Sequence, residues 1–527
     1  MLLGNLSANY RVLGESHRAL ATAQAALDVA QSLGDTKRAL FVRESIAAIH
    51  LQRGELAPAL RGYREIVDAL PATPYPLVEG MAWNNLGLVY GRLGDRRAQE
   101  DAYRRASAAW TASGDRAGLA ETELNAADAL LDAGRVDDAE AAYRRALAFD
   151  REHGFKREEV HALGGLGRAA VARRDWPQAQ TQLDAARDLA RQIRAEALEA
   201  GIEQGLGDLA SVRGDAKAAG DAYARSLTLA EKTGDRATRV AAQASLARLD
   251  ADAGRLDAAQ KRIEGALALI ESERAAIPDP QLRTTYFSTQ RAYYDLYVDV
   301  LMRRHARAPR DGYAVRALVA AERARARALL DLVVARRIDL APRIDAALAA
   351  TLRDAEDARR ELAWRYAQLP AAADAAARDA LRDDIDRAER ELDAARGRVR
   401  DADPRYAALA QPAPLDVAAV QRDLDPGTAV FEYWLGETRG TAWRVTRDGI
   451  DAIALPPREK LERDIDALRE RLHPSDAVAT TSIDALAARR RADDAATLQL
   501  AARLGERVLP RAWRDGASRH VVVADGA

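Results

Sequence analysis

Glycine recurs at a fixed spacing through the first half of this 527-residue chain, and this spacing limits the folds that the chain can adopt. A glycine stands every 40 residues from Gly14 to Gly254, except that Arg174 fills one of the positions. A second series has the same period and consists of Gly34, Gly114, Gly154 and Gly234. Because glycine favours turns and helix ends, two turns in each unit leave room for two helices of about four turns each. Stacked units of this kind predict a superhelical solenoid.

Apolar and small residues recur at the same period, which indicates that the two helices of each unit pack together. An apolar column on the first helix is followed at the next position by a column of small residues, which would let the paired helix approach closely. The columns are Leu6, Ile46, Leu86, Ala126, Leu166, Leu206 and Leu246, and Ser7, Ala47, Gly87, Ala127, Gly167, Gly207 and Ala247. On the second helix, an alanine precedes a large residue by four positions, as Ala139 precedes Tyr143, and these form one apolar face.

This unit resembles the tetratricopeptide repeat. The first-helix pattern of that repeat is complete at Trp83, Leu86, Gly87 and Tyr90. The second-helix Tyr103 and Ala106 follow at the expected distance. The period of 40 residues is longer than the usual repeat of about 34, which we attribute to extra residues between the hairpins. We expect a tetratricopeptide-like solenoid of about seven helical hairpins over residues 1–270.

A polar column marks a candidate binding site. The residue before the apolar column is Asn5, Ser45, Asn85 and Asn125 in the first four units. In tetratricopeptide solenoids this position faces the concave groove, where asparagine amides can hydrogen-bond an extended peptide backbone. The resemblance therefore implies that these four residues bind a partner. The alternative is that a mid-helix asparagine at this position only meets solvent.

Two stretches of the repeats, 165–170 and 205–210, match the G-x-G-x-x-A fingerprint of a dinucleotide site. In such a site the glycine loop follows a strand and opens a helix, so that backbone N–H groups reach the pyrophosphate. Both stretches instead fall in the middle of a predicted helix. We therefore expect these glycines to serve helix packing, and we expect no cofactor.

Charge and cysteine content narrow the possible functions. The chain has 79 Lys and Arg against 81 Asp and Glu, a net charge of −2, which disfavours a nucleic-acid partner. It contains no cysteine, so disulfides, thiolate metal sites and a thiol nucleophile are excluded within these residues. We find no long apolar run of the kind that spans a membrane, and no signal peptide at the start. We expect a cytoplasmic protein with no membrane partner and no metal.

The pattern changes after residue 270. Residues 271–342 are predicted to be a helical connector, with one longer tyrosine-rich helix over 277–304. Residues 343–403 show two amphipathic helices broken at Leu369-Pro370, which is typical of an antiparallel coiled hairpin. The remaining residues, 404–527, are predicted to form an incomplete α/β domain, so that the whole fold is mainly α.

The elements of this domain are expected from a change to period-two alternation. We expect a β-hairpin over 430–446, a third strand over 450–455, helices over 457–473 and 492–508, and a buried strand over 520–524.

Four segments of the second half resemble the CHAT proteins, in which a caspase-like peptidase domain commonly follows tetratricopeptide repeats. They are AERARARALLDLV (321–333), DPRYAALAQPAPLD (403–416), VFEYWLGETRGTAWRVTRDGI (430–450) and HVVVADGA (520–527), and they keep the order of that family. Ala524 departs from the family, which usually has proline before Asp-Gly. The resemblance implies that 404–527 is the N-terminal part of a CHAT domain. The catalytic His and Cys of the family would lie beyond these residues, and His520 comes too early for that role, so we expect no peptidase activity from this chain.

These observations predict a scaffold or sensor region of a tetratricopeptide-CHAT cysteine peptidase, which binds a protein or peptide partner in the solenoid groove. The alternative is a non-catalytic tetratricopeptide adaptor that uses only the groove. A nucleic-acid-binding solenoid is a third possibility, which the charge balance disfavours. No small-molecule substrate is expected.

Overall fold

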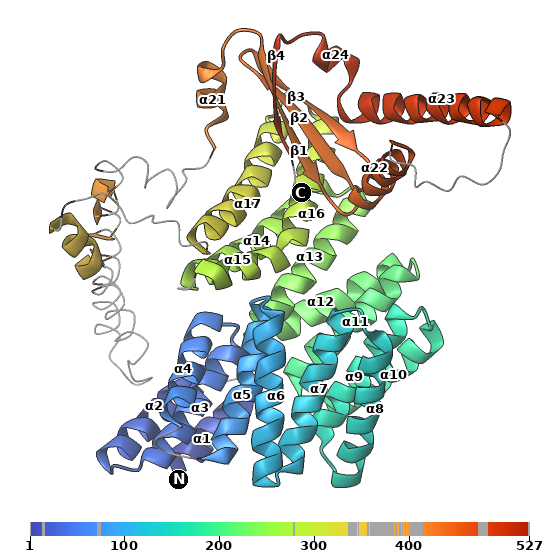
Figure 1. The fold of residues 1–527 in the computed structure, drawn as a ribbon. Coiled ribbons are helices and arrows are strands. Elements are labelled where there is room, and N and C mark those ends of the chain that lie inside the picture. Colours follow the sequence, from blue (N-terminus) through green and yellow to red (C-terminus); the bar gives the residue numbers. More distant parts are fainter. Residues whose placement is uncertain are drawn as a thin grey trace. The chain divides into compact units, whose positions relative to one another are not determined.

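The structure is a computed structural model that describes residues 2–12, 16–70, 75–277, 280–335, 415–472 and 483–524, with scattered positions between 345 and 402. The predicted helical hairpin over 343–403 therefore lies largely outside the described residues, apart from a helical stretch at 347–355 and scattered positions after it. The chain divides into two compact units (Figure 1). The first consists of residues 1–290 and 327–412, and the second of residues 291–326 and 413–527.

Paired helices fill the first unit and confirm the predicted solenoid. Among the described residues, the helices α1 to α14 form seven successive hairpins, and the first helix of each hairpin also contacts the first helix of the next. The fourteen helices are α1 (Leu2–Val12), α2 (Ser16–Ser32), α3 (Thr36–Gln52), α4 (Leu56–Ala69), α5 (Pro76–Arg92), α6 (Arg96–Ser113), α7 (Arg116–Asp132), α8 (Val136–His153), α9 (Lys156–Ala172), α10 (Trp176–Gln192), α11 (Glu196–Val212), α12 (Ala216–Thr233), α13 (Arg236–Asp252) and α14 (Leu256–Ala276).

Recurring Gly-Asp pairs explain where many of these helices end and begin. Gly114 has a φ of 73°, the left-handed conformation in which glycine ends a helix without steric cost. The carboxylate of Asp115 then accepts the backbone N–H of Gly118 at 2.9 Å and caps the start of α7. At the position where glycine is missing, Arg174 adopts the same conformation with a φ of 61°.

Close helix approach explains the small-residue column. A β-carbon added to Gly87 would lie 2.3 Å from the ring of Tyr103, and one added to Gly207 would lie 2.4 Å from the ring of Tyr223. Because such distances are impossible for a real side chain, only glycine admits the partner helix here. The glycines of the two dinucleotide-like stretches lie within α9 and α11, as expected from the sequence.

The apolar column is well covered except at its first member. Leu86 is buried, whereas Leu6 is 41% exposed, because in the described chain no earlier hairpin packs on α1.

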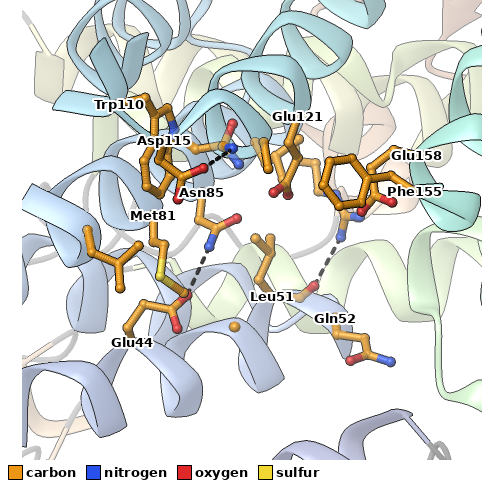
Figure 2. Close-up of a pocket in the computed structure, with 17 residues that line it drawn as sticks. Glu44, Leu51, Gln52, Met81, Asn85, Trp110, Asp115, Glu121, Phe155 and Glu158 are labelled. Carbon is orange, nitrogen blue, oxygen red and sulfur yellow. Dashed lines mark hydrogen bonds between the residues drawn. The ribbon is translucent and has the colours of Figure 1, made fainter. Parts of the chain in front are cut away.

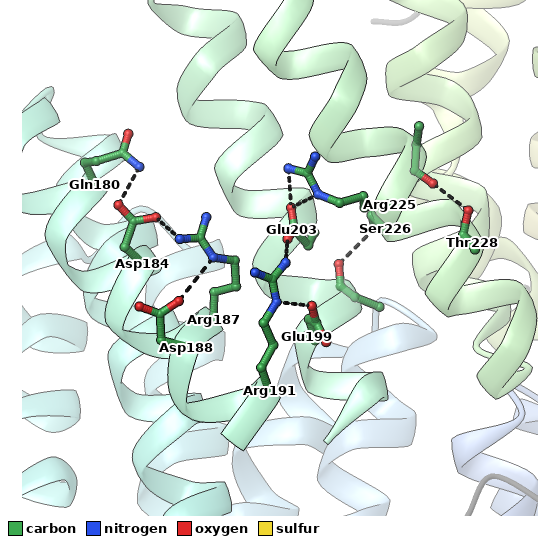
Figure 3. Close-up of polar contacts among 12 residues, drawn as sticks. Gln180, Asp184, Arg187, Asp188, Arg191, Glu199, Glu203, Arg225, Ser226 and Thr228 are labelled. Carbon is green, nitrogen blue, oxygen red and sulfur yellow. Dashed lines mark hydrogen bonds and ion pairs between the residues drawn. The ribbon is translucent and has the colours of Figure 1, made fainter. Parts of the chain in front are cut away.

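Charged residues join three successive helices of the later repeats (Figure 3). Arg191 of α10 pairs with Glu199 at 2.6 Å and with Glu203 at 2.9 Å, both on α11. Arg225 of α12 reaches the second oxygen of Glu203 at 2.9 Å. Glu203 is fully buried, so two guanidinium groups compensate the charge that it carries into the interior.

The end of the solenoid contacts its beginning. Glu273 of α14 accepts the backbone N–H of Leu56, the first residue of α4, at 2.7 Å. Arg236 of α13 lies 3.5 Å from the other oxygen of Glu273. The side chain of Glu55, which precedes α4, makes no capping hydrogen bond, so a carboxylate 217 residues away satisfies this helix start.

The connector differs from the prediction. In place of one helix over 277–304 there are two, α15 (Pro280–Thr289) and α16 (Arg291–Arg307). The hydroxyls of Ser288 and Thr289 donate to main-chain carbonyls three residues back, and the N–H of Gln290 donates to the carbonyl of Phe287 at 2.9 Å. These tight turns end α15, since they replace the usual helical hydrogen bonds.

The second unit holds a four-stranded sheet in the order β3-β2-β1-β4. The strands β1 (Thr428–Leu435), β2 (Gly440–Thr446) and β3 (Gly449–Leu455) are antiparallel neighbours, and β4 (Arg519–Val523) pairs with β1 in parallel. The helices beside α16 are α17 (Tyr313–Ala335), whose residues up to 326 belong to this unit, α21 (Val417–Asp423), α22 (Arg458–Leu472), α23 (Ile483–Val508) and α24 (Arg511–Arg514). The β-hairpin, the third strand and the first long helix agree with the sequence prediction, whereas α23 begins at Ile483, nine residues before the predicted start at 492.

The last strand differs from the sequence prediction. The sequence predicts a buried strand over 520–524, but β4 lies at the edge of the sheet, and Val522 is 60% exposed. A continuous apolar run is typical of a strand covered on both faces. In the described chain, β4 has a strand on one side only.

Candidate functional site

A cavity of about 580 Å³ lies between the first helices of four successive hairpins (Figure 2). Helices α3, α5 and α7 and the start of α9 supply most of its lining, and Trp110 at the end of α6 adds an aromatic wall. Leu51, Met81, Leu88 and Phe155 make up much of its apolar surface.

One face of α5 crosses the cavity. Met81, Asn85, Leu88 and Arg92 line it at helical steps of three and four, and Asn84 lines it beside Asn85. The repeat fold brings this face to the cavity because α5 contacts both α3 and α7.

Hydrogen bonds between neighbouring first helices join residues 41 positions apart. The amide of Asn85 donates to Glu44 Oε1 at 3.1 Å, and the guanidinium of Arg92 donates to the carbonyl of Leu51 at 3.2 Å. One hairpin later, the amide of Asn125 donates to Asn84 Oδ1 at 3.0 Å. The spacing is one repeat plus one residue, so each bond ties a helix to its counterpart in the next unit.

The four predicted site residues have different surroundings in the structure. Asn85 lines the cavity. Asn125 is only 6% exposed, and its amide donates to Asn84. The hydroxyl of Ser45 donates to the carbonyl of Phe41 in its own helix at 3.3 Å, and Asn5 is exposed on α1. Of the four, only Asn85 belongs to the lining, so the column does not form one continuous site.

Several lining residues lie outside the predicted column, notably Glu44, Asn84, Arg92, Glu121 and Glu158. Those on α5 could have been found by extending the face of Asn85 along the helix in steps of three and four. The glutamates could not, because they come from three different helices and no repeat column unites them.

Carboxylates dominate the charge of the cavity. Glu44, Asp115, Glu121 and Glu158 line it, against the single guanidinium of Arg92. Glu44 is only 3% exposed. Asp115 is engaged as the cap of α7. The cavity is therefore acidic, although the chain as a whole is almost neutral.

A partly buried polar cluster lies two turns further along α7, around Asp128. Asp128 accepts hydrogen bonds from Tyr143 of α8 and Arg168 of α9, and one of its oxygens lies 2.7 Å from His161 Nε2. Burial alone would raise the pKa of Asp128, but the neighbouring His161 and Arg168 lower it well below its usual range. Burial opposes protonation of His161, yet the charge of Asp128 and the hydrogen bond to it raise the pKa of His161 above its ordinary value.

A comparison with known protein families identifies the family of part of the solenoid. Residues 79–152 match the family model described as tetratricopeptide repeat. The solenoid contains tetratricopeptide repeats. The matched residues include the face of α5 that crosses the cavity, so the cavity lies largely within tetratricopeptide repeats.

Solved structures similar to this chain are distant. One is a Rap protein complexed with competence and sporulation factor, which is 14% identical with a TM-score of 0.43 and covers 76% of this chain and 98% of its own. Another is aspartyl phosphate phosphatase F from Bacillus subtilis, which is 13% identical with a TM-score of 0.34 and covers 61% of this chain and 93% of its own. At these scores neither likeness carries an argument here. A search of curated proteins finds no match.

Two other features are absent from the parts of the chain that the structure describes. Within those residues, no helix is both long and apolar enough to cross a membrane. In the same described residues, no group of three or more His, Asp or Glu side chains is placed to hold a metal ion.

Proposed function

We propose that this chain is a protein-interaction scaffold that binds an extended segment of a partner protein in the cavity between α3, α5, α7 and α9. The observation that carries the proposal is a cavity of about 580 Å³ lined by the first helices of four successive hairpins. Its volume falls within the range of roughly 300–1,000 Å³ that is usual for ligand pockets, which is enough for a few side chains of a peptide.

The lining suits a peptide because it combines apolar walls with amide groups. Leu51, Met81 and Leu88 offer surface to side chains. An asparagine amide has two N–H donors and an acceptor oxygen, and the bond to Glu44 uses one donor of Asn85. Asn85 is therefore the residue that we assign to a peptide backbone. Asn5, Ser45 and Asn125 stay proposed partner-binding positions, outside the lining of this cavity.

Selection of peptides tests this proposal. Purified chain would be panned against a phage-displayed library of random dodecapeptides, and the affinities of selected peptides would be measured by fluorescence anisotropy. Asn85→Ala should weaken binding about two- to tenfold, because a hydrogen bond contributes roughly 0.5–1.5 kcal/mol. Leu88→Trp, which fills the cavity, should weaken it about tenfold or more.

Arg145→Ala is the control, since Arg145 is exposed on α8 and does not line the cavity. Equal affinities for all variants would place the peptide elsewhere and overturn the proposal.

We also propose that the second half belongs to a CHAT-type cysteine peptidase, for which the solenoid acts as sensor. Two of the four resembling segments, 430–450 and 520–527, lie wholly in the second unit, and the other two contribute part of their residues to it. Arg325 of α17 donates to Glu432 Oε1 at 2.8 Å and to the carbonyl of Tyr433 at 2.7 Å, and β4 pairs with the same strand, β1. These contacts support treating the segments as parts of one domain. We further propose 271–342 as connector and 343–403 as spacer hairpin.

The alternative is a non-catalytic adaptor, and the coding sequence after codon 527 separates the two. A His and a Cys at the spacing of the family would support the peptidase, whereas a stop codon would favour the adaptor. We place the protein in the cytoplasm, in keeping with a sequence that has no cysteine.

A further inference from the structure

We infer that the cavity selects a partner segment that carries an arginine or a lysine, and that the cationic group lies among Glu44, Glu121 and Glu158. This specificity rests on the proposed function, because it names the chemistry of the peptide that the same cavity would bind.

The charge of the cavity departs from that of the chain. Its lining has four carboxylates and one guanidinium, whereas the whole chain has 81 acidic and 79 basic residues. The guanidinium of Arg92 is already directed to the carbonyl of Leu51 at 3.2 Å, which draws it toward α3. An acidic or phosphorylated segment would meet net repulsion here, and a cationic one would be attracted.

The carboxylates come from opposite walls. Glu121 of α7 and Glu158 of α9 lie on one side of the cavity, and Glu44 of α3 lies on the other (Figure 2). A guanidinium or ammonium group between them could make several charge-assisted contacts at once. Such contacts are stronger than neutral hydrogen bonds, the more so where burial limits access of water.

The walls suit the stem of a long cationic side chain. Arginine and lysine bury an aliphatic stem against apolar surface and keep their charge among polar groups. Leu51 and Met81 offer that apolar surface, while Trp110 and Phe155 offer aromatic surface. The adjoining helices already pair such groups: the guanidinium of Arg105 lies 4.6 Å from the ring centroid of Trp83, and that of Arg116 lies 5.2 Å from the centroid of Phe149.

The test uses the full chain and the same random dodecapeptide library. We expect peptides selected by the wild-type chain to share an arginine or lysine at one position. Replacing that residue by norleucine should weaken binding about tenfold, and by glutamate more strongly. Binding should also weaken as salt is raised, since the attraction is between charges.

Variants of the protein locate the effect. The double variant Glu121→Gln and Glu158→Gln should lose the preference for the cationic residue but still bind the norleucine peptide as the wild type does. Glu158→Lys should weaken the cationic peptides further and improve the glutamate version. Glu44 is left intact, because it is buried and holds Asn85. Glu152→Gln, on the exposed face of α8, is the matched control and should change nothing.

Selected peptides without charge preference, or with a preference that survives the double variant, would overturn this inference and leave the proposed function standing. A library from which the wild-type chain enriches no peptide would overturn the proposed function, and the charge specificity with it.

Discussion

At the scale of single residues, two backbone demands explain most of the glycines of the solenoid. Some stand in the left-handed turns between helices, as Gly214 does with a φ of 81°. Others stand where a partner helix leaves no room for a β-carbon, as at Gly207. The two demands are separable, because each predicts a different result when a side chain is introduced.

Gly207→Ala should destabilise the chain by about 1–3 kcal/mol, because the new methyl group overlaps the ring of Tyr223. Gly201→Ala is a matched control on the same helix, where no other atom lies within 4 Å of the added β-carbon. This second substitution should stabilise the helix by up to about 1 kcal/mol, since alanine is the better helix former. Urea unfolding followed by circular dichroism measures both. Similar effects of the two changes would contradict the packing role of Gly207.

Arg174 offers the converse experiment. It stands at the turn position that Gly214 holds in the next repeat. Its φ is 61°, a conformation that costs a residue other than glycine roughly 1–2 kcal/mol. Arg174→Gly should therefore raise the free energy of unfolding by about 0.5–1 kcal/mol, after the greater freedom of glycine in the unfolded chain is subtracted. Gly214→Arg should lower it by a similar amount. The idea fails if the Arg174 variant unfolds at lower urea than the wild type.

At the scale of elements, polar clusters tie one hairpin to the next. Asp128, Tyr143, His161 and Arg168 come from α7, α8 and α9, and the Glu203 cluster joins α10, α11 and α12. In each cluster a carboxylate on a first helix meets basic groups of neighbouring helices. The contacts between repeats are therefore partly ionic, and their strength depends on protonation.

His161 should make the stability of the solenoid depend on pH. Its pKa in the folded chain is raised above its ordinary value, because Asp128 favours the charged form despite burial and despite the nearby charge of Arg168. The stabilisation is complete below the unfolded pKa of about 6.5 and is lost as pH rises through the folded pKa. The lowered pKa of Asp128 keeps that carboxylate charged throughout this range.

We therefore expect the melting temperature to fall as pH is raised from about 6 through the folded pKa of His161. His161→Gln should flatten this part of the profile. His153→Gln serves as control, because His153 is exposed and contacts Phe149 of its own helix and Phe155, so its removal should leave the slope in place. An unchanged slope in the His161 variant would show that another group titrates.

At the scale of the whole solenoid, the contact of Glu273 with the start of α4 changes how the repeats stabilise one another. A solenoid is normally held by contacts between adjacent repeats alone. Here α14 contacts α4, and Arg236 lies beside the connecting carboxylate. We infer that the second hairpin is held by the last one as well as by its neighbours.

Glu273→Ala should release this contact. The N–H of Leu56 would lose its acceptor, which costs about 1–2 kcal/mol at a helix start. Hydrogen exchange should become faster at the first residues of α4 and stay unchanged in α9. Lys261→Ala, on an exposed face of the same helix α14, is the control. Unaltered exchange at residues 56–60 would mean that α4 does not depend on the last hairpin.

Local patterns in the sequence were enough to determine the helical hairpins, their Gly-Asp boundaries, the small-residue column and the antiparallel strands β1 to β3. Each of these depends on residues close together in the chain or related by the repeat, so periodicity and turn chemistry carry the information. For the same reason, the repeat pattern alone assigns the glycines at 165–170 and 205–210 to helix packing.

Only the tertiary structure decided which members of a repeat column have the same role. Asn85 reaches the cavity, whereas Asn125 is buried and donates to Asn84, and Asn5 is exposed, although all three hold the same repeat position. The exposed edge of β4 and the capping of α4 by Glu273 likewise come from contacts between distant segments. A repeat pattern specifies which neighbours each residue contacts in its own hairpin and in the next hairpin. Which side chains converge on one cavity depends on how several hairpins curve together, and that geometry appears only when they are assembled.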